Sequence, residues 1–108
     1  MSTKETASKT GKISQEDAFH LLENLSLRER MDHERWDLRQ MKSNIQQMRR
    51  IADTIVWKSG DKLPLQELVR ALDELSIIIQ EKDATRVVAG HTHLEHALSQ
   101  VRNSTFGL

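Results

Sequence analysis

Apolar residues recur at helical spacing along most of the chain. Ser14 is a residue type that caps helix N-termini, and a short stripe of apolar residues follows it, which predicts a first helix. From Leu27, a heptad repeat of apolar residues predicts one long helix over residues 27–57. Ser26 and Glu29 have the spacing of a capping box, which favours a helix start at Leu27, with a helix continuous through Ser26 as the alternative. The heptad positions are Leu27, Met31, Leu38, Met41, Ile45, Met48, Ala52 and Ile55, with Glu34 as the one polar exception.

A stop signal and two further apolar stripes follow this long helix. Gly60 suits a left-handed cap, Pro64 suits the first turn of a third helix, and Asp83 can cap a fourth. The apolar face rotates between Ile79 and Ala84, so we expect a kink or break there. The two stripes consist of Leu65, Leu68, Val69, Leu72, Leu75 and Ile79, and of Val87, Leu94, Leu98 and Val101.

The turn at residues 58–61 makes the second and third helices antiparallel neighbours. Folding the chain there brings Met48 opposite Leu68, and five such pairs have residue numbers that add up to 116 or 117. Because the heptad and the turn position agree, we predict an all-α fold. It is an antiparallel helical hairpin with flanking short helices, which together form a three- to four-helix bundle.

Length and composition fit a single helical domain. The chain has 108 residues with one proline, four glycines and 4% aromatic residues, which is unlike a β-sandwich or barrel. The absence of cysteine excludes disulfides and thiolate catalysis. We expect a disordered polar tail over residues 1–12, one domain over 13–103 and a frayed end over 104–108. No apolar run approaches the length of a membrane span, so we expect a cytoplasmic protein.

Charged residues are numerous but balanced. Sixteen Lys and Arg residues offset sixteen Asp and Glu residues, which argues against a protein that simply coats nucleic acid or an anionic membrane. Nevertheless, a row of basic residues repeats every seven residues on the second predicted helix, and a row of acidic residues does so on the third. In an antiparallel hairpin of these two helices, the acidic row turns away from the basic row. The rows are therefore either solvated or meet across an interface with another chain. They consist of Arg28, Arg35, Lys42 and Arg49, and of Glu67, Glu74 and Glu81.

Histidines cluster late, at His91, His93 and His96, but their spacing is not that of a metalloprotease. His91 lies along the apolar stripe, where we expect a hydrogen-bonded core or interface residue. The chain also lacks a phosphate-binding loop and a nucleophile motif. We therefore expect no metal, no cofactor and no enzymatic activity.

These features favour an interaction protein, such as an adaptor, anti-activator or chaperone, that binds a partner protein. Trp36 lies opposite the core stripe, where it either forms a binding hot spot or packs under a neighbouring helix, and methionines make adaptable surfaces. The candidate partner-binding residues are Arg28, Arg35, Trp36, Lys42 and Arg49. A nucleic-acid-binding regulator that uses the basic ridge is the alternative.

The third helix is apolar around most of its girth, and the chain is too short to cover every side of it. We therefore expect a homodimer, because twofold association would bury the exposed apolar side chains. The predicted dimer interface consists of Val69, Ile77 and Ile78.

Overall fold

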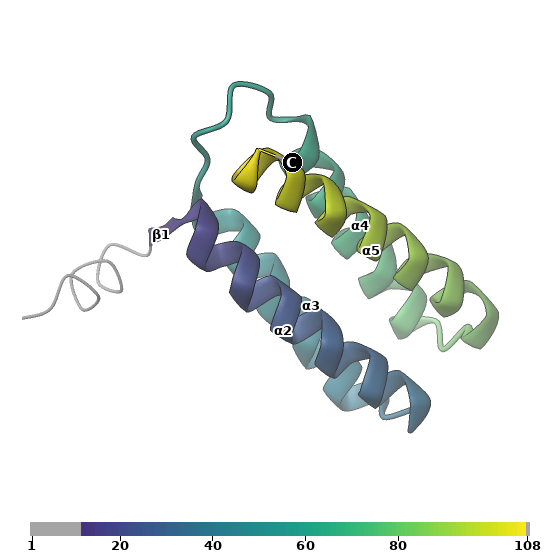
Figure 1. Cartoon of the computed structure of the whole chain (residues 1–108). Helices are drawn as coiled ribbons and strands as arrows, with labels where there is room; N and C mark the ends of the chain where they lie inside the picture. The colour runs from purple at the N-terminus through teal and green to yellow at the C-terminus, as the bar shows by residue number, and fades with distance from the viewer. Residues whose placement is uncertain (1–11, 108) are drawn as a thin grey trace, which may run out of the picture.

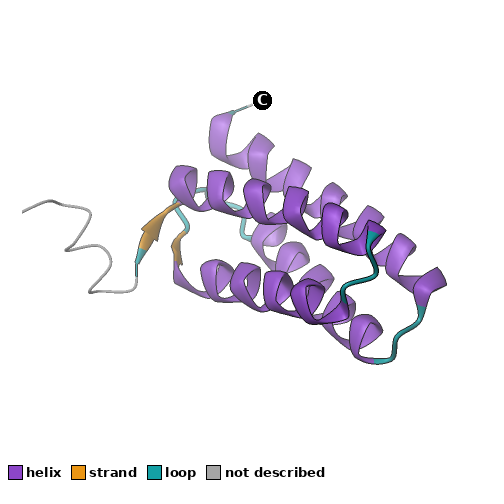
Figure 2. Cartoon of the chain, turned by 90° about the horizontal axis from the view of Figure 1, so that it is seen from below, coloured by secondary structure: helices purple, strands orange, loops and turns teal. Residues whose placement is uncertain are grey.

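The structure, a computed structural model, describes residues 12–107 and consists of four helices (Figure 1). They are α2 (Gln15–Glu34), α3 (Leu38–Thr54), α4 (Leu63–Gln80) and α5 (Ala84–Phe106). Two short strands, β1 (Ile13–Ser14) and β2 (Ile55–Val56), pair in parallel at one end of the molecule (Figure 2). The prediction of an all-α fold is confirmed.

Successive helices run in opposite directions and form a closed ring of neighbours. The α2 helix packs against α3 and α5, and α4 packs against the same two helices. Figure 1 shows this as two helical hairpins, α2–α3 and α4–α5, with a longer connection from α3 to α4. The α2–α3 and α4–α5 turns therefore lie together at one end, which we call the turn end.

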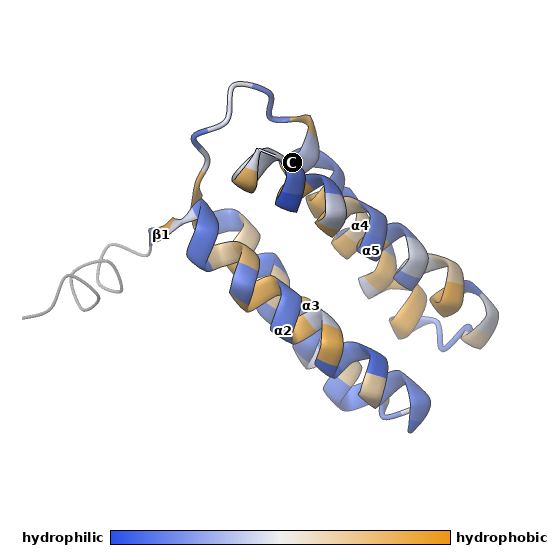
Figure 3. Ribbon diagram, viewed as in Figure 1, coloured by the Kyte–Doolittle hydropathy of each residue, from blue (hydrophilic) through white to orange (hydrophobic). Residues whose placement is uncertain are grey.

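One hydrophobic core runs through the bundle and takes residues from all four helices. Figure 3 shows the apolar residues alternating with polar ones along each helix, as amphipathic helices require. The predicted hairpin stripe is buried in this core from Met41 to Ile79. Its fully buried members include Met41, Met48, Leu68, Leu72 and Leu75.

The prediction of one helix over residues 27–57 is wrong, because the chain breaks at residues 35–37. Trp36 adopts a left-handed conformation, with φ at 53°, and the Asp37 side chain caps α3 by accepting a hydrogen bond from the Gln40 N–H at 3.1 Å. The break ends the predicted heptad before Leu38. Leu27 and Met31, expected in the core, are 52% and 56% exposed.

The capping box predicted at Ser26 does not form, because α2 continues through this residue. Ser26 and Glu29 instead extend the buried stripe that begins at Ala18 and Phe19. The alternative of a continuous helix is therefore the correct one. A buried carboxylate such as that of Glu29 requires hydrogen-bond partners, and neighbouring helices supply them.

The other helix ends agree in part with the predicted signals. Ser14 caps α2, Asp83 caps α5, and Pro64 lies in the first turn of α4. The predicted break between Ile79 and Ala84 is confirmed. Gly60 does not adopt a left-handed conformation; within residues 12–107 that conformation belongs to Trp36, Lys82 and Gly107.

The α5 helix continues beyond its predicted end. It reaches Phe106, and Gly107 follows in a left-handed cap with φ at 69°. The Phe106 ring meets the Phe19 ring edge-on at 5.6 Å, which explains why the helix extends into the segment expected to be frayed. Residues 1–11 and 108 lie outside the described residues, and so does most of the predicted N-terminal tail.

Candidate functional site

A groove of about 300 Å³ runs along the surface between α2 and α5. Its α2 side has Phe19, Ser26 and Leu27, and its α5 side has Leu98 and Ser99. These five residues give the groove three apolar side chains and two hydroxyl groups. Its remaining lining residues are charged: Glu23, Arg30, Glu95 and Arg102.

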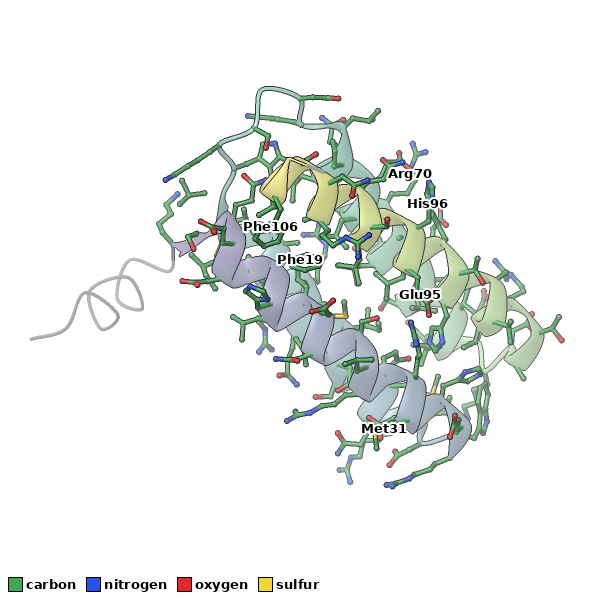
Figure 4. The ribbon with its side chains drawn as sticks, in the orientation of Figure 1. Phe19, Met31, Arg70, Glu95, His96 and Phe106 are labelled. Atoms are coloured by element: carbon green, nitrogen blue, oxygen red, sulfur yellow. The ribbon has the colours of Figure 1, made fainter. Side chains whose placement is uncertain are left out.

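Contacts between the two helices close the groove at both ends. The edge-on contact between Phe19 and Phe106 forms one end, where Figure 4 shows the two rings side by side. At the other end, Arg30 Nε donates to Glu95 Oε2 at 2.8 Å. These two contacts join α2 to α5 on either side of a stretch where the helices are less closely packed.

Two of the charged residues in the groove have no internal partner. Within the described part of the chain, neither Glu23 nor Arg102 forms an ion pair. They lie on opposite walls, one on α2 and one on α5. A ligand in the groove would therefore meet one free anion and one free cation beside an apolar floor.

A buried polar network joins three helices nearer the turn end. The Glu29 carboxylate on α2 is hydrogen-bonded to His91 Nε2 on α5 at 3.0 Å and accepts from Asn44 Nδ2 on α3 at 3.1 Å. The same amide nitrogen also donates to Asp32 at 2.8 Å. Glu29 and Asn44 are 1% and 2% exposed, so this network links the helices inside the bundle.

Burial changes the proton affinity of this network. It raises the pKa of Glu29 above its ordinary value, although hydrogen bonds from His91 and Asn44 oppose the shift. Partial burial, together with the nearby His91, lowers the pKa of His33. The His33 ring lies edge-on to the His91 ring at 4.7 Å, and Trp36 lies next to His33 at 5.9 Å.

The network is fully hydrogen-bonded and lies outside the groove. Among residues 12–107, no buried side-chain polar atom lacks a hydrogen-bond partner, and none of the network residues lines the groove. His91 was predicted as a hydrogen-bonded core or interface residue, and its place in the core is confirmed. Glu29 was missed, although a helix continuous through Ser26 would have put it on the buried stripe.

The break at residues 35–37 divides the predicted basic ridge between elements. Arg28 lies on α2, Arg35 and Trp36 lie in the turn, and Lys42 and Arg49 lie on α3. Arg49 forms ion pairs with Asp53 and with Asp73, the latter at 2.9 Å, which raise its pKa. Trp36 is 36% exposed and contacts His33, so it is neither fully exposed nor buried under another helix.

The acidic row and the histidines meet within the chain. His93 lies 3.4 Å from Glu74 and 3.7 Å from Glu67, and Glu81 pairs with Arg86 at 2.9 Å. The row therefore has partners within the chain, while Glu74 and Glu81 remain 54% and 53% exposed. His96 is bonded to Gln100, so the three late histidines have separate environments, and no group of three or more potential ligands in the described range could hold a metal ion.

The three residues of the predicted dimer interface on the third helix differ in how far they are buried within the chain. Ile78 is 7% exposed and Val69 is partly buried, and both pack in the chain's own core. Only Ile77, which is 56% exposed, remains available. The buried methionines Met41 and Met48 cannot contribute to a binding surface, whereas Met31 can.

Comparisons with models of known protein families, with curated proteins and with solved structures find no significant match. No helix within residues 12–107 combines the length and the apolar character needed to cross a membrane. The function must therefore be inferred from the surface of the bundle itself.

Proposed function

We propose that the protein is a non-enzymatic interaction module, an adaptor, anti-activator or chaperone, that binds a partner protein in the groove between α2 and α5. The observation that carries this proposal is a groove with three apolar side chains, an anion on one wall and a cation on the other, neither of which forms an ion pair within the described residues. Protein interfaces commonly combine an apolar anchor pocket with a polar rim.

The size of the groove fits side chains from a partner better than a whole helix. A volume of about 300 Å³ is at the lower limit of small-molecule pockets and is enough for one or two large apolar side chains. Phe19, Leu27 and Leu98 would contact these side chains. Glu23 and Arg102 would then pair with charges beside them, which would determine which partner binds.

A second groove, of about 270 Å³ between α3 and α4, supports binding less well. It is lined by Ile45, Leu72, Arg49 and Asp73 among others, and the last two are already paired with each other. The same pairing weakens the alternative of a nucleic-acid-binding regulator, because it neutralises one member of the basic ridge and the break separates the rest.

The test is to fill the groove with a bulky side chain. Ser99→Trp places an indole between the walls, and Thr92→Trp, on an exposed position of the same helix outside the groove, is the matched control. Tagged wild-type protein is used to isolate bound proteins, which are identified by mass spectrometry and purified. Calorimetry then measures the Kd of each purified candidate for the wild type and for both variants.

The proposal predicts that Ser99→Trp weakens binding at least about tenfold, equivalent to about 1.4 kcal/mol, while Thr92→Trp has almost no effect. Circular dichroism checks that both variants are folded. Equal affinities for all three proteins would contradict the groove. Isolation of nucleic acid, bound with a steep salt dependence, would support the alternative instead.

A further inference from the structure

A second surface consists of six exposed residues in one stripe, five of them on α2 and the sixth, Arg35, directly after its last residue. The stripe contains two apolar side chains, Leu21 and Met31, which are 45% and 56% exposed. Its three charged side chains form no ion pairs within the described residues. In chain order the stripe is Asp17, Leu21, Asn24, Arg28, Met31 and Arg35.

The spacing of these residues alternates between four and three, which is the spacing of a coiled-coil seam. It gives a narrow line along the helix, and the line is turned away from the buried stripe that contains Leu22 and Glu29. Figure 4 shows Met31 near the α2–α3 turn, at the opposite end of α2 from Phe19. The seam thus extends along the whole helix and has no partner in the chain.

The seam is complementary to itself when a second copy lies antiparallel to it. Each seam residue of one copy then lies opposite the residue of the other copy for which the two numbers add up to 52. Because of the twofold axis, every such pair occurs twice, once with each copy contributing the first residue. The two outer layers join Asp17 to Arg35 of the second copy, which are opposite charges. The next two layers join the two apolar residues, Leu21 and Met31.

The two central layers of this arrangement join Asn24 to Arg28 of the second copy. The Arg28 guanidinium has several N–H donors, and the Asn24 amide oxygen can accept from one of them. Since Asn24 is uncharged, these layers contain no repulsion. All six layers therefore bring together groups that attract one another.

Other alignments of the same seam are unfavourable. A parallel arrangement in register would place Asp17, Arg28 and Arg35 each against its own copy, which gives three layers of like charge. Sliding the antiparallel pair by one heptad in one direction would put Leu21 against Asn24 and leave Met31 beyond the end of the opposite helix. Sliding it in the other direction would put Met31 against Arg28 and leave Leu21 without a partner. The sequence of the seam therefore favours one orientation and one register.

The residues beside the seam agree with this arrangement. On the flank that turns toward the groove, Leu27 lies close to the twofold axis and meets its own copy, while His20 meets Glu34 of the second copy. On the flank that turns toward α3, Asn44 of α3 donates a hydrogen bond to Asp32 of α2 and therefore faces α2. Gln40 and Gln47 are exposed and lie one turn before and one turn after Asn44, so they border the seam. Neither glutamine carries a charge that would repel the second copy.

We propose that the protein forms an antiparallel homodimer in which the α2 seams of two copies pack together. This interface replaces the one predicted on the third helix. None of the six seam residues lines the groove, and Leu27, beside the seam, borders both surfaces. It explains why α2 has three exposed apolar residues, Leu21, Leu27 and Met31, on a helix that is otherwise polar outside the core. Since the outer layers are ion pairs at the surface, the dimer weakens at high salt.

Charge reversal across the twofold axis tests the interface. In Asp17→Arg and in Arg35→Asp, both outer layers contain like charges, so each variant alone associates more weakly. A mixture of the two variants restores opposite charges in both layers and forms a heterodimer.

Two further variants serve as matched controls, because they make the same charge changes off the seam. Glu16→Arg replaces an exposed acid in the same first turn of α2 as Asp17. Arg50→Asp removes an exposed cation near the C-terminal end of α3, just as Arg35→Asp removes one at the end of α2. Circular dichroism checks that all four variants are folded.

Sedimentation velocity over a micromolar concentration series at low salt measures the dissociation constant of each dimer. The wild type and both controls should reach twice the 12.5 kDa mass of the chain at similar concentrations. Each seam variant should dissociate at least about tenfold more readily, and the equimolar mixture should return to within about threefold of the wild type.

A wild type that remains monomeric throughout the series would overturn the proposal. Seam variants that associate as tightly as the wild type, or a mixture that associates no better than its components, would overturn it as well. These outcomes do not depend on the groove between α2 and α5, because neither Asp17 nor Arg35 lines it.

Discussion

Replacing His91 by leucine should make the stability of the bundle depend on pH through Glu29. In the native structure the buried Glu29 carboxylate has two stabilising neighbours, His91 at 3.0 Å and Asn44 at 3.1 Å. His91→Leu removes the neighbour that can carry a positive charge and keeps an apolar side chain in its place. Glu29 must then be buried as an anion with Asn44 alone, or it must take up a proton.

Protonation sets an upper limit to the destabilisation. Each pH unit above the ordinary pKa of 4.5 adds about 1.4 kcal/mol to the free energy of protonating a carboxyl group, so the limit at pH 7 is about 3 kcal/mol. Because the folded-state pKa of Glu29 is raised, and is raised further without His91, the loss of stability is small below pH 4.5 and increases as the pH rises.

Urea unfolding at several pH values, monitored by circular dichroism at one protein concentration, measures this difference. The variant should be destabilised relative to wild type by about 2–3 kcal/mol at pH 7 and by less than about 1 kcal/mol near pH 4.5. In the Glu29→Gln/His91→Leu double variant, the part of the pH dependence that comes from Glu29 should disappear because the Glu29 carboxyl is gone. A destabilisation that is the same at both pH values would refute the reasoning.

Three further predictions concern individual residues. Since the folded-state pKa of His33 is lowered, stability should decrease as the pH falls through the ordinary value of 6.5, and His33→Gln should reduce this decrease in urea titrations. Lys82 has φ at 59°, so Lys82→Gly should raise the stability by about 0.5–1 kcal/mol in thermal melts, whereas Lys82→Val should lower it. The buried Gln15 side chain accepts from the Lys58 N–H at 3.0 Å, so Gln15→Ala should cost about 1–3 kcal/mol and speed amide exchange at Lys58.

The hairpin core could be predicted because two independent signals agree there. The heptad from Met41 onward and the turn before Pro64 both require that α3 lie antiparallel to α4, and the same residues are buried in one core. The prediction that the first half of the heptad is buried was wrong, because a sequence repeat does not show which side of a helix faces the core. Leu27 and Met31 keep the spacing, but the chain turns at Trp36 and leaves them outside.

The break itself was ambiguous in the sequence. Ser26 with Glu29 and Asp37 with Gln40 both offer a cap at an N-terminus, and local hydrogen bonds of similar strength do not decide between them. Tertiary packing decides: α2 continues because Glu29 finds Asn44 and His91 on two other helices.

The groove could not be predicted because its walls are far apart in the chain. Phe19 and Phe106, or Arg30 and Glu95, become neighbours only when the ring of four helices closes. The seam on α2 was visible in part as the basic residues Arg28 and Arg35, which were assigned to a ridge that continued into α3. Its other members share a face with these two residues only because α2 begins at Gln15 and ends at Glu34.

Site-specific photocrosslinking in the producing cells can show whether a partner protein occupies the groove between α2 and α5. A benzophenone amino acid replaces Ser99 in the groove and, in a matched experiment, Thr92 outside it. The account predicts a discrete crosslinked product between Ser99 and another protein, which is absent from the Thr92 experiment. Crosslinking that is absent from Ser99, equal at both positions or directed to nucleic acid would contradict a protein-binding groove between α2 and α5.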